Sequence, residues 1–361
     1  MTGTMTWVGL DVHARSTHGA AIDSLTGELS RARFGVGTEP VIEWLAALPG
    51  PVRAVYEAGP TGFGLARAAQ RAGIEVMIAA PSKTPRARGD RVKSDRKDAE
   101  LLARLLIAGS LKAVSVPPDW LESVRHLARV REAARRDLGR SRQRVSKLLL
   151  VEGRVYPGAT AWTRAHRRWI ASQQFEHPAT ELALIDLLAA VDGLCARREA
   201  LDERLSRLAQ DPRLWPTVAR LRTFRGVDTL TALALHLELG GNWRRFLSPA
   251  KLASWLGLTP SLDQSGETAS QGKITKSGSA IARRLLVEAA WHYLPEPRIG
   301  VTLQRRQADQ PDHILQIAWR AQRRLHRTHH RLRDRHKPGN VANIAVAREL
   351  AGFLWAAATA P

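Results

Sequence analysis

Cysteine is almost absent from this sequence, since Cys195 is the only one among 361 residues. A single thiol excludes an internal disulfide framework and a zinc site built from several cysteines. Long apolar runs are also missing: the longest, residues 342–359, contains Arg348 and Glu349, and we expect it to be too short to span a bilayer. The N-terminus has no basic segment followed by an apolar one, so we expect no signal peptide, no membrane partner and a cytoplasmic location.

Lysine is scarce relative to arginine. Nine of the 55 Lys and Arg residues are Lys, and with 34 Asp and Glu the formal net charge is +21. A protein this basic is expected to bind a polyanion, and the planar fork of Arg suits phosphate. A GC-rich genome would enrich Arg as well. Because residues 1–110 carry a balance of only +3, we expect nucleic-acid affinity mainly beyond residue 110.

The first 212 residues predict two domains of different class. Residues 1–110 alternate strand-like and helix-like runs and contain a predicted hairpin, which favours an α/β domain with a mixed sheet. Residues 111–212 contain two long segments of helical periodicity, Trp120–Val151 and Glu181–Leu208. These segments predict either an antiparallel helical hairpin or a coiled-coil dimerisation arm.

The remainder of the chain predicts helices. Residues 213–300 are expected to form an all-α domain that is interrupted by a long polar loop, Gly257–Gly278. Residues 301–361 predict a basic helix followed by an apolar one.

Four carboxylates form the strongest candidate site. Asp11 and Glu57 each end a predicted strand, so a sheet can place them side by side. Asp95 and Asp98 are three residues apart at a helix start and therefore share a face. Oxygen ligands in this number suit Mg²⁺, and two such ions can clamp both reacting oxygens of a phosphodiester. The alternative interpretation is that Asp95 caps a helix, Asp98 is a solvated charge in its first turn, and Asp11 and Glu57 are surface acids.

A second candidate is Ser265, which stands beside Gly266 in the long polar loop and could approach a phosphate closely. Four cations follow that could stabilise developing negative charge: Lys273, Lys276, Arg283 and Arg284. No histidine lies close in sequence to act as a base, and a Ser-Gly pair in a polar loop is more often a turn than a nucleophile.

Residues 320–337 are a third candidate, with eight Lys and Arg, four His and one acid. A solvated helix face would explain such a segment, but its charge density favours nucleic-acid contact. The candidate contacts are Arg320, Arg323, Arg324 and Arg327. Its histidines have no acid or thiol partners at zinc spacing, so a zinc site is not predicted.

Several short motifs are jointly specific although each alone is weak. They are Gly9–Val12, Tyr56–Gly62, Lys93–Ala99, Phe224–Val227, Trp243–Phe246, Gly257–Pro260, Gln264–Gly266 and Lys276–Gly278. This collinear set resembles the DEDD-type insertion-sequence transposases, the RNA-guided group often called bridge-RNA recombinases. The sequence departs from that pattern at Arg225–Asp228, which replaces a more usual Pro-Gly-Ile-Gly, and no motif maps beyond about residue 295.

The resemblance implies a RuvC-like (RNase H fold) N-terminal domain that binds Mg²⁺ through Asp11, Glu57, Asp95 and Asp98. It also implies a C-terminal transposase domain in which Ser265 is the covalent nucleophile. The implied partners are donor and target DNA, a structured guide RNA from the element, and further copies of the chain in a dimer or tetramer. The implied location is the prokaryotic nucleoid.

Two other functions remain open on the sequence. One is a Mg²⁺-dependent, structure-specific nuclease resembling a Holliday-junction resolvase, in which water attacks and the serine loop only grips DNA. The other is a non-catalytic nucleic-acid-binding scaffold. The four acids argue against the scaffold, since it has no need of carboxylates that repel DNA.

Overall fold

A computed structural model describes residues 5–85, 95–265 and 268–361 of the chain. The chain divides into two compact units, Met1–Val116 and Pro117–Pro361. Each unit has its own hydrophobic core, and each is described by itself.

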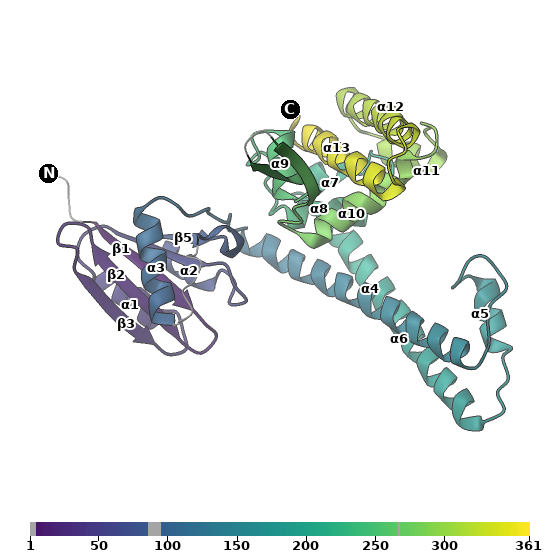
Figure 1. Ribbon diagram of the computed structural model, residues 1–361, viewed down its shortest axis with the longest axis horizontal. Helices are drawn as coiled ribbons and strands as arrows, with labels where there is room; N and C mark the ends of the chain where they lie inside the picture. Colours follow the sequence, from purple (N-terminus) through teal and green to yellow (C-terminus); the bar gives the residue numbers. More distant parts are fainter. Residues whose placement is uncertain (1–4, 86–94, 266–267) are drawn as a thin grey trace. The chain divides into compact units, whose positions relative to one another are not determined.

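The first unit is built on a five-stranded sheet with the order β3-β2-β1-β4-β5 (Figure 1). Its strands are β1 (Thr6–Val12), β2 (Thr17–Asp23), β3 (Leu29–Phe34), β4 (Val52–Glu57) and β5 (Glu75–Ala79). The pairs β1–β2 and β2–β3 are antiparallel, and the pairs β1–β4 and β4–β5 are parallel. The mixed sheet expected from the sequence is therefore confirmed.

Helices cover both faces of this sheet. Because successive strand residues point to opposite faces, Tyr56 and Val55 of β4 enter different cores. Tyr56 packs with α1 (Glu39–Ala47) and α2 (Gly64–Arg71). Val55 packs on the other side with Leu102 and Leu106 of the helix α3 (Asp95–Ile107). A short 3₁₀ helix, η1 (Pro81–Lys83), follows β5, and residues 86–94, which are rich in Arg and Lys, lie outside the described residues.

Gly9 allows α3 to lie directly on β1. A Cβ atom at Gly9 would overlap the carbonyl oxygen of Ala99 and crowd the amide nitrogen of Ala103. The first turn of α3 is thereby held over the carboxyl end of β1.

The second unit begins with a helical arm. The helices α4 (Asp119–Val151) and α6 (Pro178–Leu208) run antiparallel side by side, and α5 (Arg164–Ala171) lies at their distal end (Figure 1). Their shared core consists of Leu138, Val145, Leu149, Ile170, Leu184 and Val191. Of the two predicted arrangements, the structure shows the antiparallel hairpin within one chain.

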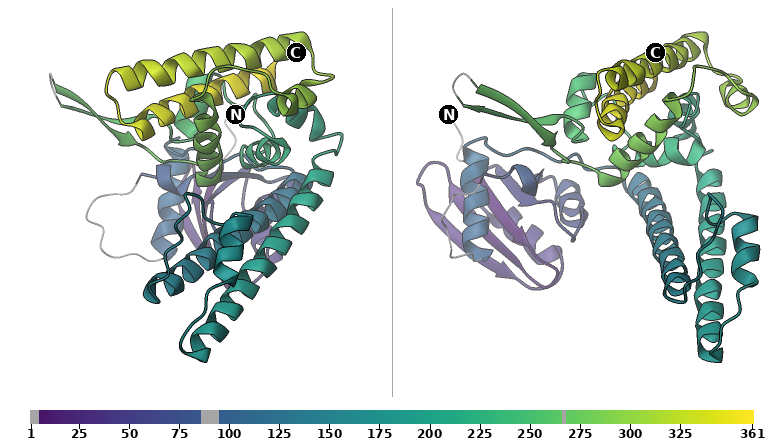
Figure 2. Two further views of the ribbon diagram at one scale, coloured as in Figure 1. Left: turned by 90° about the vertical axis from the view of Figure 1, so that its right-hand side faces the viewer. Right: turned by 45° about the vertical axis from the view of Figure 1, so that its right-hand side comes forward.

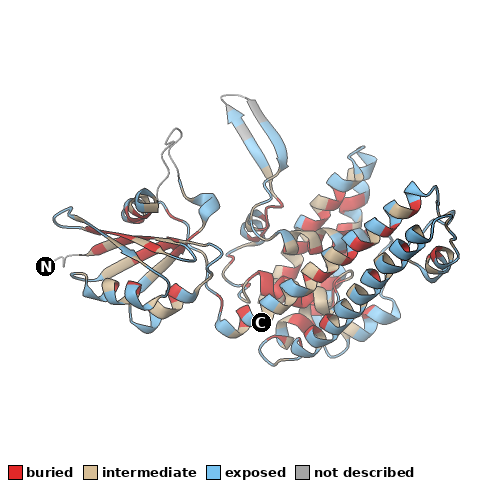
Figure 3. Cartoon of the chain, turned by 90° about the horizontal axis from the view of Figure 1, so that it is seen from below, coloured by how far each residue is buried: buried red, intermediate tan, exposed pale blue. Residues whose placement is uncertain are grey.

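The body of the second unit is helical around one large core, visible as buried segments in Figure 3. Its elements are α7 (Trp215–Leu221), α8 (Thr229–Glu238), α9 (Pro249–Trp255), α10 (Ala280–Ala290), η2 (Trp291–Tyr293), α11 (Val301–Gln307), α12 (Asp312–Asp334) and α13 (Gly339–Thr359). Side-chain caps begin three of these helices, since Asp228, Ser248 and Ser279 accept backbone N–H bonds.

The expectation of an all-α domain with a long polar loop is wrong at one place. Within Gly257–Gly278 the chain forms an antiparallel hairpin of β6 (Pro260–Ser265) and β7 (Thr268–Ile274), which projects from the helices of its unit (Figures 2 and 3). A half-buried strand is recognised in a sequence because it buries every second side chain, so that apolar and polar residues alternate. Here Leu262, the one large apolar residue of β6, is 70% exposed, so no such alternation existed.

The apolar helix α13 also differs from the expectation that the apolar run at residues 342–359 is too short to span a bilayer. With 21 residues, it is long and apolar enough to cross a membrane by length and composition. Its inner face, including Val346, Leu350 and Leu354, is fully buried in the core of the second unit. A helix used in this way is the central core helix of its domain.

Candidate active site

Two of the predicted acids end neighbouring strands. The parallel register pairs Leu10 with Tyr56, so Asp11 and Glu57 follow side by side at the carboxyl end of β1 and β4. Residues two apart in a strand point to the same face of the sheet. Gly9 and Val55 face α3, so Asp11, two residues after Gly9, and Glu57, two residues after Val55, share that face. The sheet therefore directs both carboxylates to the α3 side.

Asp95 and Asp98 occupy the first turn of α3 and approach Asp11. Burial raises the pKa of the Asp11 carboxyl, and the negative charges of Asp95 and Asp98 raise it further, while His13 opposes the shift. Like charges held this close are an arrangement that a cation would relieve.

Two histidines join this cluster that the sequence reasoning missed. His13 Nε2 lies 3.1 Å from Asp11 Oδ2 and 3.8 Å from Asp95 Oδ1. His18 Nδ1 lies 3.6 Å from Asp95 Oδ2, because the β1–β2 register places His18 directly opposite Asp11. For His13 the signal was its position two residues after Asp11, which puts both side chains on one side of an extended chain. The predicted hairpin joined the strands now seen as β2 and β3, so it gave no signal for His18, which the β1–β2 pairing brings to Asp11.

The donor set fits a divalent cation. Ligand atoms of Asp11, His13 and Asp95 all lie within 4.8 Å of one another. Carboxylate oxygens suit Mg²⁺ and Mn²⁺, and imidazole is accepted by Mn²⁺ more readily than by Mg²⁺.

Ser265 is the last residue of β6, where its backbone pairs with Thr268. The base of the hairpin is held by main-chain bonds from Thr275 N to Thr259 O (2.9 Å) and from Lys276 N to Gly257 O (3.1 Å). The hairpin thus carries Ser265 at its tip on a firmly anchored stem.

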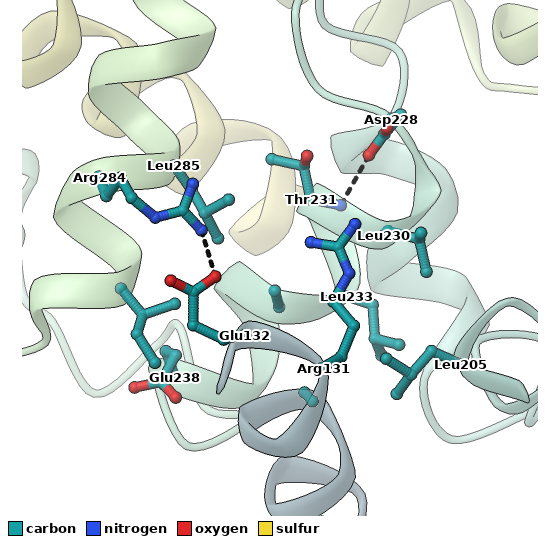
Figure 4. A pocket seen from close by; sticks show the side chains of 13 residues that line it. Arg131, Glu132, Leu205, Asp228, Leu230, Thr231, Leu233, Glu238, Arg284 and Leu285 are labelled. Atoms are coloured by element: carbon teal, nitrogen blue, oxygen red, sulfur yellow. Dashed lines mark hydrogen bonds and ion pairs between the residues drawn. The ribbon is translucent and has the colours of Figure 1, made fainter. Parts of the chain in front are cut away.

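The four cations that follow Ser265 in sequence fall into two groups, and none is at the hairpin tip. Lys273 and Lys276 are exposed at the base of the hairpin, away from Ser265. The Arg283 guanidinium donates to the carbonyls of Leu256 (2.9 Å) and Ser277, which fastens the hairpin stem to α10. Arg284 pairs with the buried Glu132 of α4 at 2.7 Å and with Glu288 (Figure 4). Both arginines are therefore occupied by protein partners.

The arginines predicted on α12 are also divided. Arg320, Arg323 and Arg327 are exposed. Arg324 Nε lies 2.7 Å from Glu349 Oε2 of α13, so this side chain ties two helices together.

Comparison with known proteins places both units in one family. A family described as transposase, of the DEDD IS110 type, matches residues 8–152, and one described as the transposase IS116/IS110/IS902 family matches residues 218–299. The first match contains all four acids, and the second contains the β6–β7 hairpin. A DEDD-type transposase implies use of a divalent metal and a DNA substrate.

Individual relatives agree with this assignment. The chain is 42% identical to "Putative transposase y4qE" of Sinorhizobium fredii over 84% of this chain and 74% of that protein. It is 30% identical to the transposase for insertion sequence element IS1533 of Leptospira borgpetersenii, over 92% and 97% of the two chains. It is 27% identical to the transposase for element IS1328 of Yersinia enterocolitica, over 80% and 84%. The chain belongs to the IS116/IS110/IS902 family of DEDD transposases.

Proposed function

We propose that this transposase is an RNA-guided DNA recombinase that cuts and rejoins strands through a covalent phosphoserine intermediate. The observation that carries the proposal is the meeting of Asp11 and Asp95, with Asp98 nearby, at the carboxyl end of β1. The strand order, with one antiparallel edge and α3 over β1, supports an RNase H-like (RuvC-like) fold for residues 1–110.

The acids would hold Mg²⁺, with Asp11 and Glu57 contributed by the sheet and Asp95 and Asp98 by α3. Bound Mg²⁺ would supply positive charge at the scissile phosphate and favour loss of the serine proton. Ser265 Oγ then forms a bond to phosphorus as the bond from phosphorus to the leaving strand oxygen breaks, and that oxygen takes up a proton. Because the new bond is again a phosphodiester, the strand can be rejoined without ATP.

Basic residues of the second unit would bind the nucleic acids, namely donor and target DNA and a structured guide RNA. Lys273 and Lys276 are exposed at the base of the hairpin, so they suit phosphates of the bound strand at a distance from Ser265. Arg320, Arg323 and Arg327 form an exposed row on α12. Residues 111–212 would act as an arm that associates protomers into a dimer or tetramer, residues 213–300 as the transposase domain and residues 301–361 as its C-terminal helices. Such a protein would work at the nucleoid in the cytoplasm.

The metal role is tested by replacing each acid separately with Ala. Asp11→Ala, Glu57→Ala, Asp95→Ala and Asp98→Ala should each reduce strand cleavage at least about 100-fold in Mg²⁺, on the scale of a lost electrostatic catalytic group. DNA binding should persist, because each change removes a charge that opposes phosphate. Normal cleavage by three of the four variants would show that the site lies elsewhere.

The serine is tested by trapping the protein–DNA adduct. Ser265→Ala should bind DNA and form no adduct, whereas Ser261→Ala and Ser270→Ala serve as controls and should form it normally. Cleavage without an adduct in the unchanged protein would favour the water-using nuclease, and the adduct mapping to Ser261 or Ser270 would move the nucleophile.

A further inference from the structure

A cavity of about 380 Å³ opens at the carboxyl end of the sheet in the first unit. Three loops enclose it: the turn after β1, the segment between β3 and α1, and the segment between β4 and α2. Its size falls in the range of small-ligand sites, which span roughly 300–1,000 Å³.

The lining of this cavity is uncharged apart from His13, which matters in a chain with a net charge of +21. The floor is apolar: Val12 is half-buried, and Leu65 and the fully buried Tyr56 lie beneath. Val36, 78% exposed, lies at the rim. Hydroxyls come from Thr17, Thr38 and Thr61, and backbone is open at Gly35, Gly37, Gly62 and Gly64. An apolar surface with a few hydrogen-bonding groups suits a neutral, flat ligand and disfavours a phosphate.

The cavity is separated from the carboxylates by the thickness of one strand. Asp11 points to the α3 side, and Val12, the next residue, lines the cavity on the other side. His13 belongs both to the carboxylate cluster and to the cavity, because its Nε2 lies 3.1 Å from Asp11 Oδ2 and its side chain also lines the cavity. A strand whose phosphate lies at the acids would reach the cavity by passing His13, the residue common to both places.

We propose that this cavity receives one unstacked deoxynucleotide, base and sugar, adjacent to the phosphate that is cut. The assignment rests on the proposed function, because it takes the acids to be the cleavage centre. The base leaves the stack and lies against Val12 and Val36, while the threonine hydroxyls and loop backbone meet its polar edge. Extruding a base from the stack lets an enzyme surround that single nucleotide in a pocket.

Two glycines allow the cavity to be filled without disturbing the backbone. The Cβ positions of Gly35 and Gly64 are surrounded by open space, and neither residue has a positive φ. Gly35→Phe and Gly64→Phe should therefore fold and occupy the cavity. Gly193→Phe, at an exposed position of α6 whose Cβ is equally open, is the matched control.

The experiment uses the full chain with its DNA substrate, in which 2-aminopurine replaces one base at a time across the cut. Emission of 2-aminopurine rises when the base unstacks. We expect a several-fold rise at one position beside the cut, retained in Gly193→Phe and lost in both cavity variants. Binding without a rise at any position, or a rise that survives in both filled variants, would overturn the assignment.

An abasic residue at the responding position gives a second, independent measurement. Gly64→Phe should slow cleavage of intact DNA, and the difference from the unchanged protein should vanish on abasic DNA, as expected for two changes that remove the same contact. An equal slowing on both substrates would contradict the proposal, as would a response confined to RNA strands. Failure of the proposed function would show separately, as loss of metal-dependent cleavage in the unchanged protein.

Discussion

His236 is a buried histidine in the core of the second unit, 4% exposed. Trp243 Nε1 donates to its Nδ1 at 3.1 Å, so the neutral ring is an acceptor in the folded chain. Burial lowers the pKa of His236 to about 4, from an ordinary value of 6.5. Protonation is therefore disfavoured by the fold and favoured by unfolding.

The sign of the pH dependence follows from these values. Between pH 6.5 and about 4, His236 is protonated in the unfolded chain and neutral in the folded chain. The free energy of unfolding therefore falls as the pH falls through this window. The contribution lost is about 3 kcal/mol, from 1.36 kcal/mol per pKa unit over the shift from 6.5 to about 4.

We predict that His236→Gln, which keeps an acceptor for Trp243, flattens this part of the stability curve. Urea unfolding at pH 7 and pH 4.5 should show a smaller loss for the variant than for the unchanged protein. His126→Gln, on an exposed ring, is the control. An identical loss in the two proteins would mean that His236 is protonated in the fold.

At the scale of elements, a buried charge network fastens the arm to the helical body. Glu238 of α8 is 7% exposed. Its carboxylate accepts hydrogen bonds from Arg129 Nε of α4 at 2.9 Å and from the hydroxyl of Ser279, the N-cap of α10, at 2.7 Å. Glu132 of α4, 5% exposed, accepts hydrogen bonds from Arg135 of the same helix and from Arg284 of α10. Figure 4 shows the bond between Arg284 and Glu132. Helices α4, α8 and α10 thus share charges that none could bury alone.

We predict that Glu238→Gln destabilises the protein by about 1–3 kcal/mol, because Arg129 and Ser279 lose a charged acceptor. Glu288→Gln is the matched control: this acid is exposed and pairs with Arg284, so its loss should cost under about 0.5 kcal/mol. Urea denaturation distinguishes the two. Equal effects would show that the network at Glu238 adds nothing beyond a surface ion pair.

The sequence predicted elements best where side chains are buried with a clear period. The central strands of the first unit were identified as short apolar runs, because helices cover both faces of the sheet. The long helices were identified because their apolar residues recur every three to four positions. The acids could be placed for a related reason, since each stands at the end of such an element. The β6–β7 hairpin was missed because it buries too little to show a pattern.

Partners across the chain could not be predicted in the same way. Arg283 and Arg284 look like free cations in sequence, yet carbonyls and acids brought near by folding take up their donors. His18 entered the candidate site through strand register. Such pairings depend on tertiary structure, and sequence spacing carries little information about them.

At the scale of the whole molecule, the arm ends in apolar side chains that its own chain does not cover. Leu150 and Val151 close α4 and are 64% and 82% exposed, and Leu182 and Ile185 near the start of α6 are 67% and 56% exposed. Because Leu149 and Leu184 share one core, these four residues gather at the distal end of the arm. Exposed apolar patches of this kind commonly mark contacts between proteins.

We predict that Val151→Glu combined with Leu182→Glu weakens self-association of the full chain by about tenfold or more, since each buried apolar side chain contributes roughly 1.5–3 kcal/mol. Light scattering over a dilution series measures the change. Leu247→Glu is the control, because Leu247 is 87% exposed and lies outside the arm. The double variant should keep the thermal stability of the unchanged monomer, since the replaced side chains pack against little in their own chain. A multimer that persists unchanged in the double variant would move the contact to another surface, and a multimer lost equally in Leu247→Glu would show that added negative charge, and not the apolar patch, governs association.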